Sequence, residues 1–353
     1  MAFLHVVSRE KDPYDRGFAL GTQIKDLVKS NLHVYMKSFL HYGLSRSSVI
    51  RIARGFKPIF EKYDQNMLYE MKGLADSASL KLEEVLALNV RYELIWGSRA
   101  GCTSIAIQPE ASKDAHTLIG QNWDWLVSVG DSCHTWRIVE SGKPDIICFT
   151  EGGILGPKVG MNSAGLSLAI SGLVSGKDGI RKGVPFHLIC RKILESSSMN
   201  EPLEFIERIP RAGSANYLIA HKEGEILNVE TSPDQVGYLY PQNRMLVHTN
   251  HFLALKVDDV GRRRYPDSVI RYFRCQRLLS QQRDGFTSDD IQRILSDHFN
   301  FPNSICFHSS ESGPSEEREQ TNASVVLDLN NHSLRIAKGN PCKNQFEQIS
   351  IRE

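Results

Sequence analysis

This sequence of 353 residues lacks three features, each of which would have assigned it to a class of protein. It has no apolar run approaching the roughly 18 to 20 residues that a membrane-spanning helix needs. Its first residues, 1–11, carry charges and a histidine where a secretory signal needs an apolar core, so we expect a cytoplasmic protein. With 42 Lys and Arg against 41 Asp and Glu, it has no charge excess that would favour nucleic acid or a membrane as a partner.

The motifs of metal and nucleotide sites are also absent. None of the seven cysteines forms a C-x-x-C pair, so neither a zinc site nor a redox motif is indicated, and we expect no metal and no cofactor. His248 and His251 have no third ligand nearby in the sequence, which favours hydrogen-bonded structural histidines over a metal pair. The glycine-rich stretch 152–160 leads into a predicted strand rather than a helix, which favours tight turns over a phosphate loop.

The first hundred residues have a helical pattern after a short strand at 5–8. The run Asp12-Pro13-Tyr14-Asp15 has the early proline and the acids typical of a helix start. Apolar residues then recur at helical spacing as far as Phe39. Three more helices are predicted at 48–63, 66–78 and 82–96.

The pattern changes at Gly101-Cys102, where a series of strands begins. We predict strands at 102–108, 117–125, 135–140, 146–150, 158–161, 165–171, 215–221, 226–231, 245–250, 323–329 and 334–337. Helices are predicted at 185–195, 202–209, 269–279 and 288–298, and a mobile loop at 311–320. Thr287 opens the last of these helices, with Asp290 as a variant of the capping box. This order differs from the βαβ alternation of a parallel sheet. It predicts an α+β fold of antiparallel sheets covered by helices, with a helical segment in front.

Gly101 and Cys102 stand where the helical segment meets the first strand of the sheet region. Glycine adopts backbone angles closed to other residues, and it has no side chain to block attack on its own carbonyl. The thiol of the next residue can add to that carbonyl, forming a thioester that water then cleaves. The product has a thiol and an α-amino group on one residue, and an amine with a pKa of about 7.7–8.0 suits a general base. An ordinary buried cysteine at a strand start is the alternative.

Two polar side chains elsewhere fit the same chemistry. Asp124 stands between two tryptophans on the next predicted strand and therefore points to the face opposite to both. Its carboxylate can orient an N-terminal ammonium, or it can cap a turn or pair with a surface cation. Asn250 carries an NH2 group of the kind that stabilises an oxyanion.

Tryptophans on a sheet either line an apolar pocket or pack in a core, and the second is commoner. The candidate substrate-pocket residues are Trp123, Trp125, Glu151 and His248.

Several short strings together resemble the acyl-coenzyme A:6-aminopenicillanic acid acyltransferase family, whose members are N-terminal-nucleophile (Ntn) hydrolases. The strings occur in family order and near family spacing across residues 101–329. They are Gly101-Cys102-Thr103, Gly120-Gln121-Asn122-Trp123-Asp124, Thr150-Glu151-Gly152-Gly153-Ile154, Val159-Gly160-Met161-Asn162-Ser163-Ala164-Gly165, Gly183-Val184-Pro185, Val247-His248-Thr249-Asn250-His251 and Asn303-Ser304-Ile305-Cys306.

The resemblance implies a four-layer αββα sandwich and autocatalytic cleavage between Gly101 and Cys102. A helical chain, 1–101, and a longer chain, 102–353, would stay associated. It further implies that Cys102 is the nucleophile and its new α-amine the base, that Asp124 supports processing, and that Asn250 is an oxyanion donor.

The implied reaction is acyl transfer through a thioester on small amides or acyl thioesters. We expect an amidase for small N-acyl compounds, with an acyl-coenzyme A-dependent N-acyltransferase or a catalytically silent binding protein as alternatives. One departure makes penicillin acyl transfer doubtful. The penicillin-making members carry a Ser-Arg pair just before the penultimate strand, where this sequence has Thr321-Asn322.

Overall fold

The computed structural model of the protein describes residues 2–95, 101–310 and 314–351, and two large sheets form its centre. The eight-stranded sheet has the order β1 (Leu4–Ser8), β4 (Cys133–Ile138), β5 (Ile146–Glu151), β6 (Val159–Asn162), β7 (Leu166–Gly172), β8 (Ala215–His221), β9 (Ile226–Thr231) and β10 (Val236–Leu239). The six-stranded sheet has the order β11 (Met245–His248), β2 (Gly101–Ile107), β3 (Leu118–Leu126), β12 (Glu319–Asp328), β13 (Ser333–Lys338) and β14 (Glu347–Ser350). Neighbouring strands are antiparallel except for β1, which runs parallel to β4.

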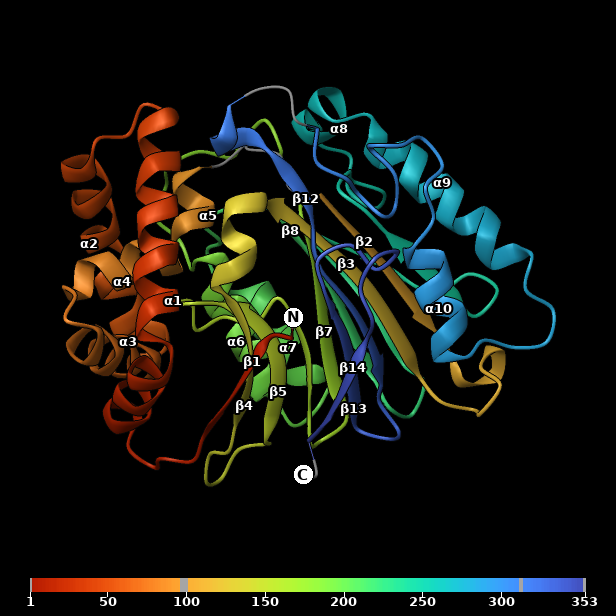
Figure 1. Ribbon diagram of the computed structural model, residues 1–353, viewed down its shortest axis with the longest axis horizontal. Helices are drawn as coiled ribbons and strands as arrows, with labels where there is room; N and C mark the ends of the chain where they lie inside the picture. Colours follow the sequence, from red (N-terminus) through yellow and green to blue (C-terminus); the bar gives the residue numbers. More distant parts are fainter. Residues whose placement is uncertain (1, 96–100, 311–313, 352–353) are drawn as a thin grey trace.

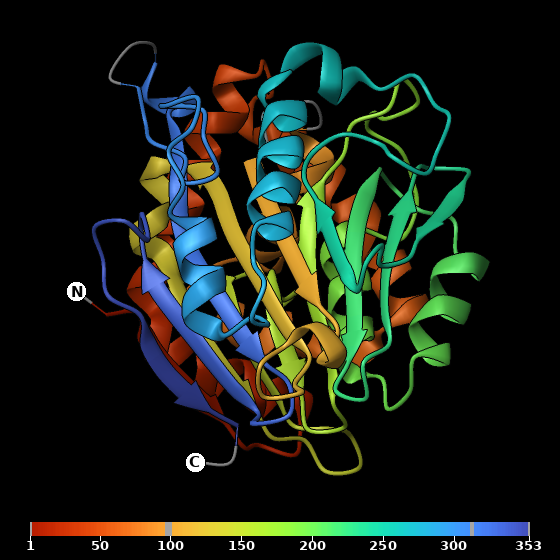
Figure 2. The same ribbon diagram turned by 90° about the vertical axis from the view of Figure 1, so that its right-hand side faces the viewer.

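Helices cover the outer face of each sheet. Helix α6 (Phe186–Glu195) packs on β6, β7 and β8 and is followed by α7 (Asn200–Arg208). On the other side, α9 (Asp267–Ser280) packs on β11 and β2, and α10 (Ser288–Leu295) packs on β3 and β12. Figure 1 shows the sheets between these helix layers, and Figure 2 looks onto α9 and α10 lying across the six-stranded sheet. The predicted α+β class and the αββα sandwich are confirmed.

The N-terminal helices form a bundle beside the sheets. They are α1 (Pro13–His41), α2 (Arg46–Tyr63), α3 (Gln65–Ala78), α4 (Leu82–Asn89) and α5 (Arg91–Leu94). The Asp12 carboxylate caps α1 as expected, accepting from the backbone N–H groups of the next turn. Helices α1 and α3 approach so closely that a Cβ on Gly73 would lie 2.0 Å from the carbonyl oxygen of Tyr14. The helix predicted at 82–96 is divided into α4 and α5, and its end at Trp96 lies outside the described residues.

The hydrophobic core consists of two layers on either side of the six-stranded sheet. One apolar cluster fills the space between the sheets and extends under the N-terminal helices, and it includes Cys102 and Trp123. The other fills the space between the six-stranded sheet and the helices α9 and α10, and it includes Ile105 and Ile291. Because β2 and β3 are buried on both faces, their side chains alternate between the two layers. The strand that begins at Gly101 therefore lies at the centre of the molecule.

Some element boundaries differ from the sequence prediction. Helix α10 opens with the predicted capping box of Thr287 and Asp290, but it ends at Leu295, so that His298 lies in a loop. The predicted loop 311–320 contains a short turn of helix at Ser315–Glu317 and the start of β12 at Glu319, while residues 311–313 lie outside the described part. None of the helices in the described ranges combines the length and apolar character that crossing a bilayer requires.

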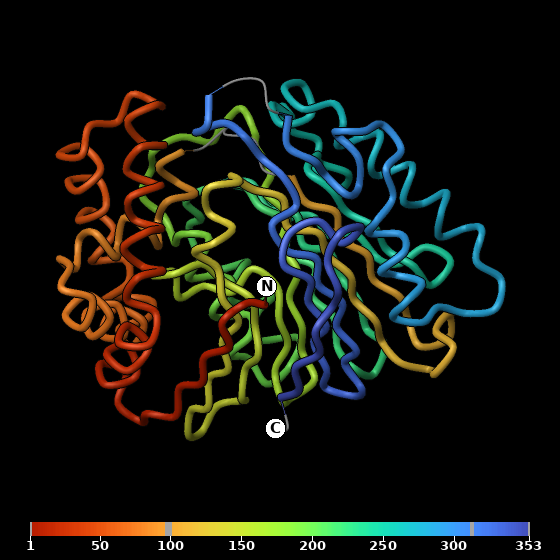
Figure 3. The backbone as a smooth tube through the Cα atoms, viewed as in Figure 1, coloured from red at the N-terminus to blue at the C-terminus, as the bar shows by residue number. Residues whose placement is uncertain are grey.

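The first hundred residues are part of the sandwich as well as of the helical bundle. Strand β1 completes one edge of the eight-stranded sheet through its parallel pairing with β4, and Figure 3 follows the chain from this edge out into the helices. The apolar cluster between the sheets also continues into α1, α2, α3 and α4. A division at residue 101 therefore cuts through one continuous core.

Candidate active site

The pairing of β2 with β3 places Gly101 directly opposite Asp124 and Cys102 opposite Trp123. Residues directly opposite each other in antiparallel strands point to the same face of the sheet, so the Asp124 carboxylate lies over Gly101. A Cβ on Gly101 would lie 2.8 Å from the Asp124 Cβ and 2.9 Å from its Oδ2. Glycine is therefore required at position 101 for space, which the sequence argument from backbone angles did not anticipate.

Cys102 is buried, and its backbone N–H donates a hydrogen bond to Asn250 Oδ1 at 2.8 Å. Burial and the negative charge of Asp124 raise the pKa of the Cys102 thiol to about 12. The thiol in the uncut chain is therefore protonated at neutral pH. A base close to the thiol is needed before it can act as a nucleophile.

The fully buried Asp124 carboxylate accepts a hydrogen bond from the Thr321 hydroxyl at 2.6 Å. Thr321 is itself held through its backbone and its side chain. Its N–H donates to the Phe307 carbonyl, and its Oγ1 accepts from the Phe307 N–H. The pair Thr321-Asn322 lies within β12 rather than before a penultimate strand, and the Asn322 NH2 donates to the carbonyls of Trp125 and Leu126. The two residues that replace the Ser-Arg pair thus hold Asp124 and the end of β3 in place.

Asn250 follows β11 and connects Cys102 to two other elements. Its Oδ1 accepts from the Cys102 N–H and also from Arg271 Nη2 at 3.0 Å, while its Nδ2 donates to the Gly172 carbonyl at 3.1 Å. Two donors on one side and a carbonyl on the other determine the orientation of the amide. In the uncut chain the NH2 group of Asn250 is therefore engaged by Gly172, at the end of β7.

Arg271 is a site residue that the sequence analysis missed. It is a buried residue of α9, and its Nη1 donates to the Cys102 carbonyl at 2.6 Å and to Thr103 Oγ1 at 3.0 Å. Its Nε donates to Asp267 Oδ2 at 3.2 Å, one turn earlier in the helix. A signal for it does exist in the sequence: Arg271 shares the helix face of the buried Cys275 and Leu279, where an arginine needs polar partners. The guanidinium joins Cys102 and Asn250 into one network.

Trp123 and Trp125 point away from Asp124 into the core between the sheets, as the strand alternation predicted. Each is only 3% exposed, and their rings stack with centroids 6.4 Å apart. The Trp125 N–H donates to the Tyr35 hydroxyl at 2.7 Å. Trp123 shares a sheet face with the Cys102 side chain, so it forms a wall beside the thiol. Its role toward a substrate stays a prediction.

Glu151 lies in a buried ion cluster under the N-terminal helices. Its Oε1 lies 2.5 Å from Arg91 Nη2 and 3.1 Å from Lys158 Nζ, and its Oε2 accepts from the Tyr35 hydroxyl at 2.5 Å. Burial alone would raise the pKa of Glu151, but the positive charges of Arg91 and Lys158 outweigh it and lower the pKa. These contacts connect α1, α5 and the eight-stranded sheet, and a place for Glu151 in the substrate pocket stays a prediction.

His248 is fully buried, and its Nε2 lies 2.8 Å from Glu230 Oε1 on β9 of the other sheet. Glu230 also accepts from the backbone N–H groups of Leu253, Ala254 and Leu255, which belong to the segment after Asn250. His251 is likewise hydrogen-bonded, with its Nδ1 2.8 Å from Ser268 Oγ. The histidine side chains thus link neighbouring segments around Asn250.

We expect Glu230→Gln to lower the free energy of unfolding by about 3 kcal/mol at pH 7, because it removes the buried carboxylate that binds His248 and three backbone N–H groups. Burial alone would raise the Glu230 pKa, but the hydrogen bond from His248 and the His248 charge outweigh it and lower the pKa below 4.5. The contribution of Glu230 to the free energy of unfolding is therefore fully present above pH 4.5 and is lost as the pH falls below that value. Urea unfolding at pH 7 and at lower pH checks this, with the exposed Glu225→Gln as control. An equal loss at every pH would contradict it.

The two facing sheets, with helices outside and Cys102 near the start of a central strand, have the fold of the Ntn hydrolases, enzymes that act on amide bonds. The fold is similar to that of a single-residue variant of conjugated bile acid hydrolase from Clostridium perfringens, with a TM-score of 0.51 and 16% identity over 71% of this chain and 93% of that chain. The Caenorhabditis elegans ortholog of N-acylethanolamine-hydrolyzing acid amidase gives a TM-score of 0.48 and 16% identity, covering 65% of this chain and 93% of that chain.

The sequence comparisons place the chain more narrowly within this class. The sequence model of the acyl-coenzyme A:6-aminopenicillanic acid acyl-transferase family matches residues 111–343. The 40 kDa form of acyl-coenzyme A:6-aminopenicillanic-acid-acyltransferase from Emericella nidulans is 31% identical over 285 residues, which cover 77% of this chain and 74% of that protein. The chain belongs to the acyl-coenzyme A:6-aminopenicillanic acid acyl-transferase family.

Proposed function

We propose that the protein cleaves itself between Gly101 and Cys102 and then uses Cys102 to hydrolyse small N-acyl compounds. The observation that carries this proposal is the set of contacts around Cys102. Its nitrogen is bound by Asn250 at 2.8 Å, its carbonyl by Arg271 at 2.6 Å, and the preceding glycine lies against the Asp124 carboxylate. An ordinary structural cysteine needs none of these contacts.

In the cleavage step, the Cys102 thiol adds to the Gly101 carbonyl and the peptide nitrogen leaves, so that the acyl group moves from nitrogen to sulfur. Water then hydrolyses the thioester, leaving a carboxylate on Gly101 and a free amine and thiol on Cys102. The thiol proton passes to the departing nitrogen, and the Asp124 carboxylate, which lies against Gly101, supports this step. Thr321 holds the carboxylate in this position through its 2.6 Å hydrogen bond.

In the amidase step, the new α-amine is the base for the thiol, because a free amine titrates near neutral pH. Asn250 Oδ1, already on this nitrogen, orients the amine toward sulfur. The substrate acyl group forms a thioester with Cys102 and the amine product leaves, and water then hydrolyses the thioester to release the carboxylic acid and restore the thiol. For Asn250 Nδ2 to stabilise the oxyanion, it has to exchange its hydrogen bond to Gly172 for one to the substrate oxygen.

Turnover of a library of N-acyl amides by the purified protein tests the proposal. An acyltransferase that uses coenzyme A thioesters is the second candidate, and it is supported by the similarity to the Emericella nidulans enzyme. The two are separated by adding an amine acceptor and measuring how the acyl group divides between water and the amine. Failure to turn over any amide or thioester, with Cys102 inert to thiol reagents, would favour a silent binding protein.

We expect Gly101→Ala to stop self-cleavage, because the added methyl group would lie 2.8 Å from the Asp124 Cβ and displace the carboxylate. The uncut variant retains a buried Cys102 thiol whose pKa is raised by burial, so iodoacetamide should label that residue slowly at pH 7 and faster as the pH rises. Peptide mapping of the labelled cysteines measures both effects. Gly55→Ala, where a Cβ meets open space, is the matched control and should be cut normally. A cut, rapidly labelled Gly101→Ala protein would exclude this mechanism.

The two products of cleavage, 1–101 and 102–353, are expected to remain together. The parallel pairing of β1 with β4 and the shared core support this association. Size-exclusion chromatography of the cut protein, followed by denaturing electrophoresis of the single peak, tests it. A cytoplasmic location stays a prediction from the sequence.

A further inference from the structure

Four side chains with metal-binding atoms converge at the edge of the six-stranded sheet, away from the nucleophile. They are His298, Cys306, His308 and Cys342, and one ligand atom from each lies within 4.8 Å of all the others. The first three belong to the loop between α10 and β12, and Cys342 belongs to the connection between β13 and β14. His308 and Cys306 are buried, while His298 and Cys342 are exposed, so the cluster lies at the protein surface.

Four of the six distances between these atoms match those of a tetrahedral zinc site. A zinc ion lies about 2.3 Å from a sulfur ligand and about 2.05 Å from a nitrogen ligand. In a tetrahedral site these bond lengths place two sulfurs about 3.8 Å apart, a sulfur and a nitrogen about 3.6 Å apart, and two nitrogens about 3.3 Å apart. The Sγ atoms of Cys306 and Cys342 are 3.6 Å apart. His308 Nε2 lies 3.4 Å from Cys306 Sγ, 3.5 Å from Cys342 Sγ and 3.1 Å from His298 Nε2. Each of the four distances is within about 0.2 Å of its tetrahedral value.

Neither a disulfide nor a pair of hydrogen-bonded imidazoles accounts for the whole arrangement. A disulfide requires the two sulfurs to be about 2.05 Å apart, and these are 3.6 Å apart. A hydrogen bond between the imidazoles explains the contact of His298 with His308 but not the two thiols at the same point. The Asn340 NH2 group lies 3.6 Å from Cys306 Sγ and in position to donate to it, an arrangement suited to a thiolate.

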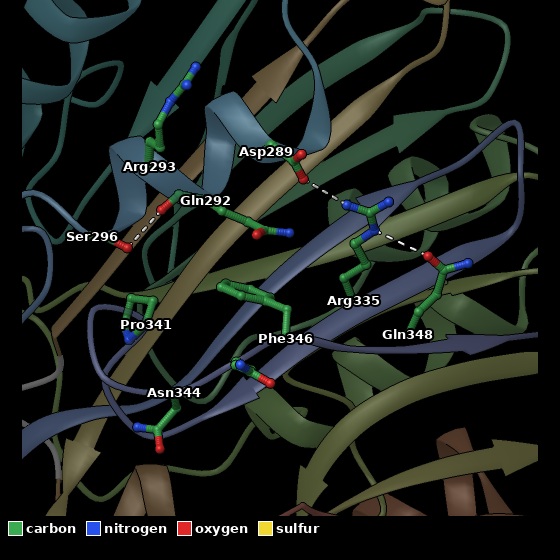
Figure 4. A pocket seen from close by; sticks show the side chains of 10 residues that line it. Asp289, Gln292, Arg293, Ser296, Arg335, Pro341, Asn344, Phe346 and Gln348 are labelled. Atoms are coloured by element: carbon green, nitrogen blue, oxygen red, sulfur yellow. Dashed lines mark hydrogen bonds and ion pairs between the residues drawn. The ribbon is translucent and has the colours of Figure 1, made fainter.

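The backbone around the cluster is well anchored. The Cys306 N–H donates to the Asp297 carbonyl and the His308 N–H to the Pro302 carbonyl, so the loop is bonded to itself on either side of the ligands. The turn that carries Cys342 is closed by hydrogen bonds from Lys343 and Asn344 to the Asn340 carbonyl. Figure 4 shows the neighbouring hollow of about 720 Å³, where Ser296, Pro341 and Asn344 come from the same two segments. The ligand atoms are thus positioned by two ordered turns.

We propose that His298, Cys306, His308 and Cys342 bind one zinc ion. Two thiolates and two imidazoles select zinc over the harder magnesium and calcium ions. Because the protein supplies all four ligands, no position remains for a substrate, and the ion is structural. It fastens the loop after α10 to the connection between β13 and β14.

The zinc-bound loop also reaches the candidate active site. Between the ligands Cys306 and His308 lies Phe307, whose backbone binds Thr321, the residue that donates to Asp124. The Ile305 carbonyl of the same loop accepts from Asn122, the neighbour of Trp123 on β3. The ion therefore anchors the loop that contains Phe307. Phe307 holds Thr321, and Thr321 in turn holds the Asp124 carboxylate.

Metal analysis of the full-length protein, purified without chelators, tests the proposal and should find one zinc per chain. Replacement by cobalt should produce the visible absorption of tetrahedral cobalt and the near-ultraviolet band of thiolate-to-cobalt charge transfer. Cys342→Ser and His298→Ala each remove an exposed ligand and should lower the zinc affinity at least about tenfold. The matched controls are Cys133→Ser and the exposed His33→Ala, which should retain the zinc.

A chelator should lower the melting temperature of the wild-type protein and of both controls, but not that of the two ligand variants. These readouts do not depend on self-cleavage or on amidase activity. Wild-type protein without zinc that also gives no cobalt bands would overturn the proposal. Ligand variants with the same zinc affinity as the controls would do so as well.

Discussion

The Cys102→Ala variant is expected to be a single uncut chain without amidase activity. The wild-type protein should give two fragments under denaturing conditions, the larger beginning at Cys102, whose masses sum to that of the full chain plus one water. The reason is that both steps use the same sulfur, first on the Gly101 carbonyl and then on the substrate. Loss of the nucleophile of a covalent mechanism lowers the rate by about 10⁶-fold. Intact-mass spectrometry and amidase assays of the two proteins check both expectations.

Cys133→Ser is the matched control for this experiment. Cys133 is also a buried cysteine at the start of a strand, but its thiol donates to the Val129 carbonyl, a hydrogen bond that a serine hydroxyl can keep. This variant should be cut and active. A Cys102→Ala protein that is cut at the same bond would exclude Cys102 as the agent of cleavage, and an uncut variant with full amidase activity would exclude it as the nucleophile.

The second large effect is expected from Arg271→Lys, which should lower kcat at least about 100-fold, as removal of a well-placed donor does in other enzymes. One guanidinium binds the Cys102 carbonyl, Thr103 Oγ1 and Asn250 Oδ1 together. A lysine ammonium is a compact donor on a flexible stem and cannot span these positions. Because Arg271 acts through Cys102 and Asn250, it is a positioning residue, and KM should change much less than kcat.

Arg274→Lys is the control, because Arg274 lies on the same helix and pairs with Asp297 instead. A purely structural role for Arg271 would lower the melting temperature and the fraction of active protein. It would leave kcat per titrated active site unchanged. That outcome, or equal kcat values for the two variants, would contradict the positioning role.

Much of the fold could be predicted from the sequence because its strands are apolar and bounded by turn residues. The strands at 215–221 and 226–231 were predicted at the observed positions, and the caps at Asp12 and Thr287 were predicted too. Strands β10 and β14 were missed, because each has only four residues and is only partly buried at a sheet edge. Helix α10 was predicted three residues too long, since Asp297 and His298 continue the helical pattern without forming the helix.

The sequence predicted only those residues of the candidate site that lie within the short runs resembling the family. Cys102, Asp124 and Asn250 are each part of such a run, and the sheet pairing and one amide hydrogen bond bring them together. Arg271 was missed because its partners lie far away in the sequence, on β2 and after β11. The four proposed zinc ligands were missed for the same reason. Their spacing, with 33 residues between His308 and Cys342, contains no short motif, and only the sheet brings the two segments together.

The order of the site residues along the chain has a consequence for biosynthesis. Every residue that we propose to act on Gly101 comes after it, and the last, Thr321, lies on the strand that pairs with β3. A ribosome must therefore release almost the whole polypeptide before the bond can break. Truncated or misfolded chains would keep the peptide intact and the thiol inert. Self-cleavage would then restrict activity to molecules in which the whole chain has folded.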